Sequence, residues 1–114
     1  MIKVVNIKKD FPNSEYAVFL VEKEIEYSKK EGVDVLVVVH GYGASGVGGL
    51  IKSEVHIKLK ELVNKGKIKS FIPGEKFSEI NSLDSEKIIK KHPNILIESQ
   101  YNLNPGITII NISI

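Results

Sequence analysis

This 114-residue chain contains no cysteine, no tryptophan and no arginine. Without cysteine it has no disulfide framework, no thiolate zinc site and no cysteine nucleophile, which excludes a disulfide-stapled secreted mini-protein and a zinc finger. The longest apolar run, residues 35–39, is far shorter than the roughly 20 residues that span a bilayer. The strand-like first residues are unlike a secretion signal. We therefore expect a cytoplasmic protein with no membrane partner.

The absence of arginine also limits how the chain can hold an anion. All 16 basic residues are lysines, against 14 acidic residues, so the formal net charge is +2. A lysine ammonium is a point charge, whereas the arginine guanidinium holds a phosphate or a base edge with two parallel hydrogen bonds. If the chain binds nucleic acid, we expect contacts to the phosphate backbone to outweigh base reading.

The length is enough for one hydrophobic core and too short for two, so we expect a single domain over residues 1–114. The first part of the chain has the periodicity of three strands joined by two helices. The strands are expected at 2–7, 34–39 and 67–72. The helices are expected between an N-cap at Asn13 and a stop at Gly32, and over 50–64. The uninterrupted apolar run at 34–39 predicts a central strand, with parallel pairing through strand–helix–strand crossovers.

The last third of the chain is less regular. A short helix is expected over 83–91, followed by strands over 95–101 and 107–114. Between these two strands, Asn104-Pro105-Gly106 suits a tight turn, because proline and then glycine fit its central positions. The pattern predicts a terminal antiparallel hairpin.

Five of the nine glycines lie in residues 40–49, between the most buried strand and the second helix. Gly41 to Gly46 fit the Gly-x-Gly-x-x-Gly dinucleotide fingerprint, which also needs an acidic residue about 20 positions on, at the end of the next strand. Glu61 has this spacing but lies inside the second helix, and Glu75 lies at a strand end but too far along. The lysine of a Walker loop is absent, and Val47 replaces the second glycine of a nucleophile elbow. A general anion site remains, because free N–H groups and the helix dipole meet at a helix N-terminus.

His40 stands at the exit of the central strand, beside this loop. There it is a candidate to contact phosphate or to act as an acid or base near neutral pH. The alternative interpretation is structural: the glycines allow close packing and His40 caps the edge of the sheet. The residues alone leave both interpretations open.

The second helix carries a basic flank that begins near the glycine loop. Lys52, His56 and Lys60 are spaced at four-residue intervals, so they lie on one side of the helix. On the other flank, Glu54 with Lys58 and Glu61 with Lys65 are spaced for ion pairs. The flank is either a contact surface for an anionic partner or a solvated helix face.

The loop and the segments after it resemble the Smr (small MutS-related) domain family. The family signature His-Gly-x-Gly stands here as His40-Gly41-Tyr42-Gly43, followed by a helix, Pro73-Gly74-Glu75 and a strand after Asn104-Pro105-Gly106. The extra glycines up to Gly49 are similar to those of the small stand-alone bacterial members. The resemblance implies an α/β fold, an α+β two-layer sandwich with a βαβαββ-type mixed sheet. It also makes residues 77–102, with a short helix before the terminal hairpin, an extra segment that we expect to cover a sheet edge.

The resemblance further implies binding to DNA or RNA and, in some members, nicking of the nucleic acid. In the family an Asp-x-His motif on the first strand completes the proposed active site. Here Asn6-Ile7-Lys8 stands in its place, and neither the Asn6 amide nor a protonated Lys8 can act as a base. Whether the chain is an enzyme therefore stays open.

The leading hypothesis is a nucleic-acid-binding domain that contacts DNA or RNA phosphates through the glycine-rich loop and lysines. The residues expected at these phosphates are Lys8, Gly41, Tyr42, Gly43, Gly46, Gly48, Lys52 and His56. One alternative is an endonuclease that uses His40, with Mg or Mn as an assisting ion and no metal ligands assigned. A second alternative is a catalytically inactive module that binds a small anion or a protein partner.

Overall fold

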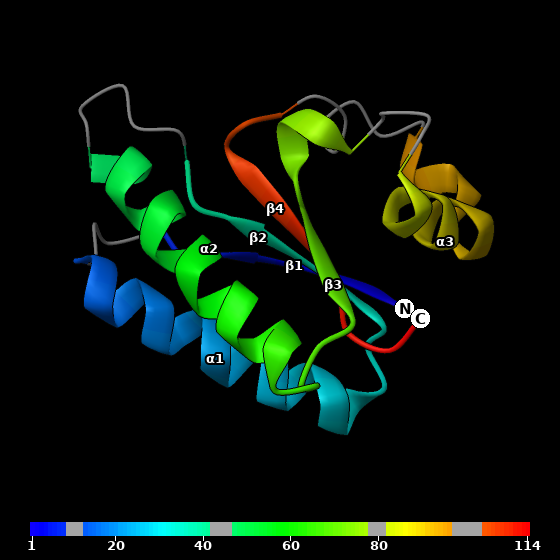
Figure 1. Ribbon diagram of the computed structural model, residues 1–114, viewed down its shortest axis with the longest axis horizontal. Coiled ribbons are helices and arrows are strands. Elements are labelled where there is room, and N and C mark those ends of the chain that lie inside the picture. The colour runs from blue at the N-terminus through cyan, green and yellow to red at the C-terminus, as the bar shows by residue number, and fades with distance from the viewer. Residues whose placement is uncertain (9–12, 42–46, 78–81, 97–103) are drawn as a thin grey trace.

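In the computed structural model, four strands form one mixed sheet in the order β1-β2-β4-β3 (Figure 1). The strands are β1 (Ile2–Asn6), β2 (Val35–Val39), β3 (Ser70–Pro73) and β4 (Ile107–Asn111). β1 and β2 are parallel, and β4 is antiparallel to both β2 and β3. The structure describes residues 1–8, 13–41, 47–77, 82–96 and 104–114. The predicted α/β class and mixed sheet are confirmed, with β2 inside the sheet.

The helices begin and end at residues that suit those positions. They are α1 (Ser14–Glu31), α2 (Val47–Asn64) and α3 (Leu83–Lys91), with short 3-10 helices η1 (Gly74–Lys76) and η2 (Pro93–Leu96). The Asn13 side chain accepts a hydrogen bond from the Tyr16 N–H, and Gly32 ends α1 at φ 76°, so both predicted caps are confirmed. None of the helices in the described segments is long and apolar enough to cross a membrane.

The sheet has a hydrophobic core on each face, because side chains alternate along β2. Leu36 and Val38 pack with α1 and α2, whereas Val35 and Val37 pack with residues of α3 and η2. Figure 1 shows α1 and α2 together on one side of the sheet and α3 on the other. α3 and η2 therefore add a third layer to the expected two.

The second core corrects the expectation for residues 77–102. Phe77, Ile88 and Ile95 are buried against β-strand residues such as Ile109, so the described part of this segment covers a face of the sheet rather than an edge. The predicted strand over 95–101 begins inside η2, and its remaining residues lie outside the described part of the chain. β4 instead lies between β2 and β3. The strand expected at 67–72 is found at 70–73.

Candidate functional site

The turn at residues 104–106 holds the loop end of the sheet together. The Gly106 carbonyl accepts hydrogen bonds from the His40 and Gly41 N–H groups, each at 3.0 Å. The Gly106 N–H in turn donates to Asn104 Oδ1 at 2.9 Å. The point where the chain leaves β2 is therefore tied to the start of β4. In the described residues, this turn does not join the two strands of the predicted hairpin. It instead binds the backbone at the end of β2 through hydrogen bonds.

His40 points into the protein. Its side chain is 0% exposed, with Nδ1 2.6 Å from the Gly41 carbonyl oxygen and Nε2 2.8 Å from Thr108 Oγ1. Burial lowers the pKa of His40, against a smaller opposing effect of the bond to Gly41. Both ring nitrogens are thus engaged inside the fold. This geometry matches the structural interpretation of His40 rather than proton transfer to an external substrate.

His56 also faces inward, toward the same hydroxyl group. Its Nε2 lies 2.7 Å from Thr108 Oγ1, and its ring packs edge-on against His40 with 6.0 Å between centroids. Burial is the main cause that lowers the pKa of His56 to about 4; electrostatic interaction with the neighbouring His40 and Lys52 adds to it, because a second positive charge there would be unfavourable. His56 is therefore neutral at pH 7, and the positive charge that the basic flank would need from it is missing.

Lys52 is neutralised by an acidic residue far away in the sequence. Its Nζ donates to both carboxylate oxygens of Glu75 at 2.9 Å and to the Pro105 carbonyl at 3.0 Å. Burial alone would raise the pKa of Glu75, but the bond from Lys52, a backbone hydrogen bond and the charge of Lys52 together outweigh this effect, so the net shift is downward. The expected basic flank on α2 is thus largely compensated. Lys60, farther along, is exposed.

The opposite flank of α2 is paired, with one difference from the expected pattern. Lys65 binds Glu61 at 2.8 Å, as the spacing predicts. Lys58 binds Glu61 at 3.1 Å and Glu22 of α1 at 3.3 Å, rather than Glu54. The Glu22 contact ties the two helices together, which a search for pairs within one helix does not reveal.

Lys8 lies beside the start of the glycine loop. Gly41 has φ 74°, a conformation that side chains disfavour, and a Cβ atom there would lie 3.4 Å from Lys8 Cδ. The Ile7 N–H donates to the Val39 carbonyl and the Lys8 N–H to Asn6 Oδ1, both at 3.0 Å. These bonds carry the parallel pairing past β1 and place the exposed Lys8 side chain next to Gly41. The Gly41 N–H is occupied by Gly106, so it is not a free donor for phosphate, which corrects that expectation.

The N-terminus of α2 completes this end of the molecule. The carboxyl ends of β1 and β2 and the first turn of α2 lie at the same end (Figure 1). The first turn of this 18-residue helix contains no acidic residue, and Gly48 lies within it. Tyr42, Gly43 and Gly46 lie outside the described residues.

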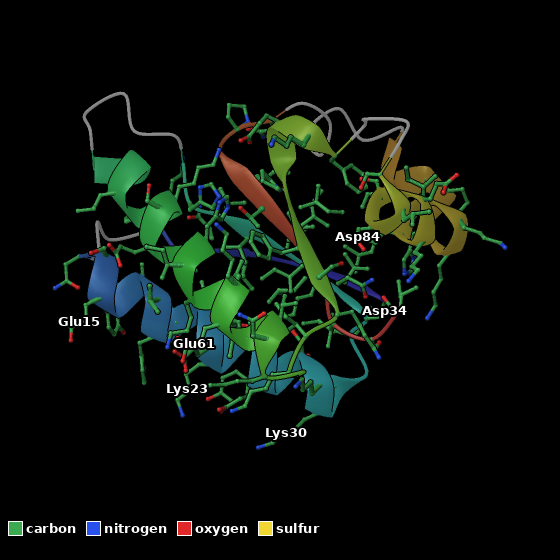
Figure 2. All side chains as sticks on the ribbon, viewed as in Figure 1. Glu15, Lys23, Lys30, Asp34, Glu61 and Asp84 are labelled. Atoms are coloured by element: carbon green, nitrogen blue, oxygen red, sulfur yellow. The ribbon has the colours of Figure 1, made fainter. Side chains whose placement is uncertain are left out.

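A second charged cluster surrounds Asp34, which Figure 2 labels on the side of the molecule opposite the first turn of α2. Its side chain is 6% exposed and binds Lys91 Nζ at 2.6 Å, His92 Nε2 at 2.9 Å and the Met1 amine at 3.0 Å. Burial alone would raise the pKa of Asp34, but the bonds from Lys91, the amine and His92 hold it well below its usual range. The cluster ties the end of α3 to the sheet. His92 thus has a structural partner beyond its place at a helix end.

No group of three or more His, Asp or Glu side chains in the described residues is arranged to hold a metal ion. The described residues therefore provide no such cluster for the Mg or Mn ion of the endonuclease alternative. The sequence reasoning missed Thr108 and Glu75. A lone hydroxyl in an isoleucine-rich strand was the available signal for Thr108.

Comparison with protein-family models, with curated proteins and with solved structures gave no match to this chain.

Proposed function

We propose that the protein binds phosphate groups of DNA or RNA at the end of the sheet where β1 and β2 finish and α2 begins. The observation that carries this proposal is the position of Lys8 beside Gly41, at the carboxyl edge of a parallel strand pair. An 18-residue helix without acidic residues in its first turn begins at the same end. A helix N-terminus favours an anion, and the lysine adds a formal charge to it.

The chemistry of the site favours the phosphate backbone over the bases. Lysine binds phosphate as a point charge, and the chain has no arginine to recognise a base edge with two bonds. Lys52 is held by Glu75, so Lys8 is the main cationic side chain of the site among the described residues. We therefore expect weak binding that tolerates many sequences and declines steeply with salt.

The binding test uses labelled single-stranded and double-stranded DNA and RNA, with fluorescence anisotropy measured at several salt concentrations. Each phosphate contact contributes roughly one unit to the slope of log K against log salt. Lys8→Gln should reduce that slope by about one unit and weaken binding at low salt. Lys30→Gln is the matched control, because it removes the same charge from an exposed position in the last turn of α1.

Three results would contradict the proposal. They are no binding at low salt, binding that does not respond to salt, and equal weakening by Lys8→Gln and Lys30→Gln. Thermal stabilisation by inorganic phosphate without binding to any polymer would favour the small-anion alternative. Metal-dependent nicking of a plasmid that disappears in a folded His40 variant would favour the endonuclease.

A further inference from the structure

His56, Thr108, His40 and Gly41 form a continuous chain of hydrogen bonds beneath α2. The three links measure 2.7 Å from His56 Nε2 to Thr108 Oγ1, 2.8 Å from Thr108 Oγ1 to His40 Nε2, and 2.6 Å from His40 Nδ1 to the Gly41 carbonyl. Thr108 and His40 are both fully buried. Buried polar groups of this kind need partners, so the chain is a requirement of the fold at this point.

The chemistry of the atoms fixes which group donates and which accepts in each of these hydrogen bonds. A carbonyl oxygen only accepts, so His40 Nδ1 carries the proton that bonds to Gly41. In a neutral imidazole the other nitrogen is then an acceptor, so His40 Nε2 receives the hydroxyl proton of Thr108. The Thr108 oxygen keeps lone pairs that accept the proton on His56 Nε2. Every link thus has one donor and one acceptor.

The hydrogen-bond chain ends at Gly41, which follows β2 at the start of the glycine-rich loop. Gly41 donates its N–H to Gly106 and accepts a bond from His40 through its carbonyl. With both of its peptide groups held, the two torsion angles of Gly41 are set, including its φ of 74°. The direction in which the chain leaves β2, past the Lys8 side chain, is set with them.

We propose that His56 and Thr108 are positioning residues, which act through His40 to hold Gly41 in the conformation that the phosphate site needs. This inference rests on the proposed function for its ligand, but the hydrogen-bond chain exists in the free protein. It assigns His56 a role inside the fold, in place of the direct phosphate contact expected from its spacing. It also assigns a role to the buried hydroxyl group of Thr108.

The first test is nitrogen-15 NMR of the three histidines in the free wild-type protein at pH 7. The expected result is a neutral His40 with its proton on Nδ1, and His56 with a proton on Nε2. A His40 ring with its proton on Nε2, or a positively charged His40, would contradict the proposed order of donors and acceptors. This result does not depend on whether nucleic acid binds.

The second test compares Thr108→Val with Thr108→Ser. Valine keeps the shape of threonine without the hydroxyl, whereas serine keeps the hydroxyl and loses a methyl group. We expect Thr108→Val to speed hydrogen exchange of the Gly41 amide, which is bonded to Gly106, and to weaken oligonucleotide binding roughly fivefold to tenfold. Thr108→Ser should stay near wild type in both measurements.

The readouts separate the two proposals. If wild-type protein binds no oligonucleotide but only the valine variant shows faster exchange at Gly41, the proposed function fails and the positioning chain stands. If both folded variants exchange and bind alike, Thr108 does not position Gly41 and the inference is wrong. If Thr108→Val does not fold, the wild-type proton positions and the behaviour of Thr108→Ser still decide the question.

Discussion

Gly74→Ala tests how closely η1 packs against the turn that clamps the site. Gly74 is buried, and a Cβ atom there would overlap the Asn104 carbonyl oxygen. It would also lie 2.5 Å from Ile107 Cγ1 and 2.8 Å from the Ile107 carbonyl oxygen. Two of these three atoms belong to the backbone, so a rotation of side chains cannot relieve the contact. Either η1 or the start of β4 must move.

The size of the effect follows from the number and kind of contacts. Adding a methyl group to a packed core costs about 1–3 kcal/mol and occasionally more. Because the backbone contacts at Gly74 cannot adapt, we expect a loss of about 3 kcal/mol in the free energy of unfolding. Gly66→Ala is the matched control: its φ is +72° and nothing lies within 4 Å of the added atom. Its cost is only that of a left-handed residue, about 1–2 kcal/mol.

The assay is equilibrium unfolding in urea, with the two variants and the wild type measured in parallel. We expect Gly74→Ala to unfold at the lowest urea concentration, and to weaken oligonucleotide binding because the displaced turn holds His40 and Gly41. Gly66→Ala should bind like the wild type. A Gly74→Ala protein as stable as Gly66→Ala would refute the packing argument.

Three further predictions follow from the charged and polar contacts. Because the pKa of His56 is lowered to about 4, the unfolded chain binds more protons than the folded protein between about pH 6.5 and 4. The free energy of unfolding should therefore fall by about 1–2 kcal/mol as the pH drops through this window. In urea unfolding, His56→Gln should make stability depend less on pH over the same range. Asp34→Asn should destabilise by about 1–3 kcal/mol at pH 7, because Lys91 and His92 lose their buried partner; since the folded-state pKa of Asp34 is lowered, the difference should persist above pH 4 and shrink only below it, and a constant difference down to pH 2 would contradict the ion-pair account. Glu75→Gln should release Lys52 and strengthen oligonucleotide binding with a steeper salt dependence, whereas unchanged affinity in the anisotropy assay would show that Lys52 does not reach the ligand.

Local patterns were sufficient for the elements that local physics controls. The central position of β2 could be predicted because its run of apolar residues is unbroken. The Asn13 cap and the Gly32 stop could be predicted because residues next to a helix end control how the helix begins and ends. The strands that pair with β4 could not be predicted. A turn with proline and glycine indicates that the chain changes direction, but not which strand the following segment pairs with. The structure uses 104–106 to clamp β2 and places β4 between β2 and β3.

The candidate site shows the same limit. The spacing of Lys52 and His56 correctly places them on one side of α2, but not what faces that side. Glu75 and Thr108 lie far from α2 in the sequence but contact it in the fold. Glu75 forms an ion pair with Lys52, and Thr108 hydrogen-bonds to the neutral His56, so the flank is not basic as expected. The sequence leaves open whether His40 faces a ligand or has a structural role, whereas in the structure His40 is completely buried and shares the Thr108 hydroxyl with His56 of α2.

The most direct test of the central claim is an amide NMR titration of the wild-type protein with a short oligonucleotide at low salt. If phosphate binds at the loop end of the sheet, the largest shifts should occur at Lys8, Gly41 and the first turn of α2, and added salt should reverse them. Shifts centred on α3 and Asp34, or no shifts at all, would contradict the account.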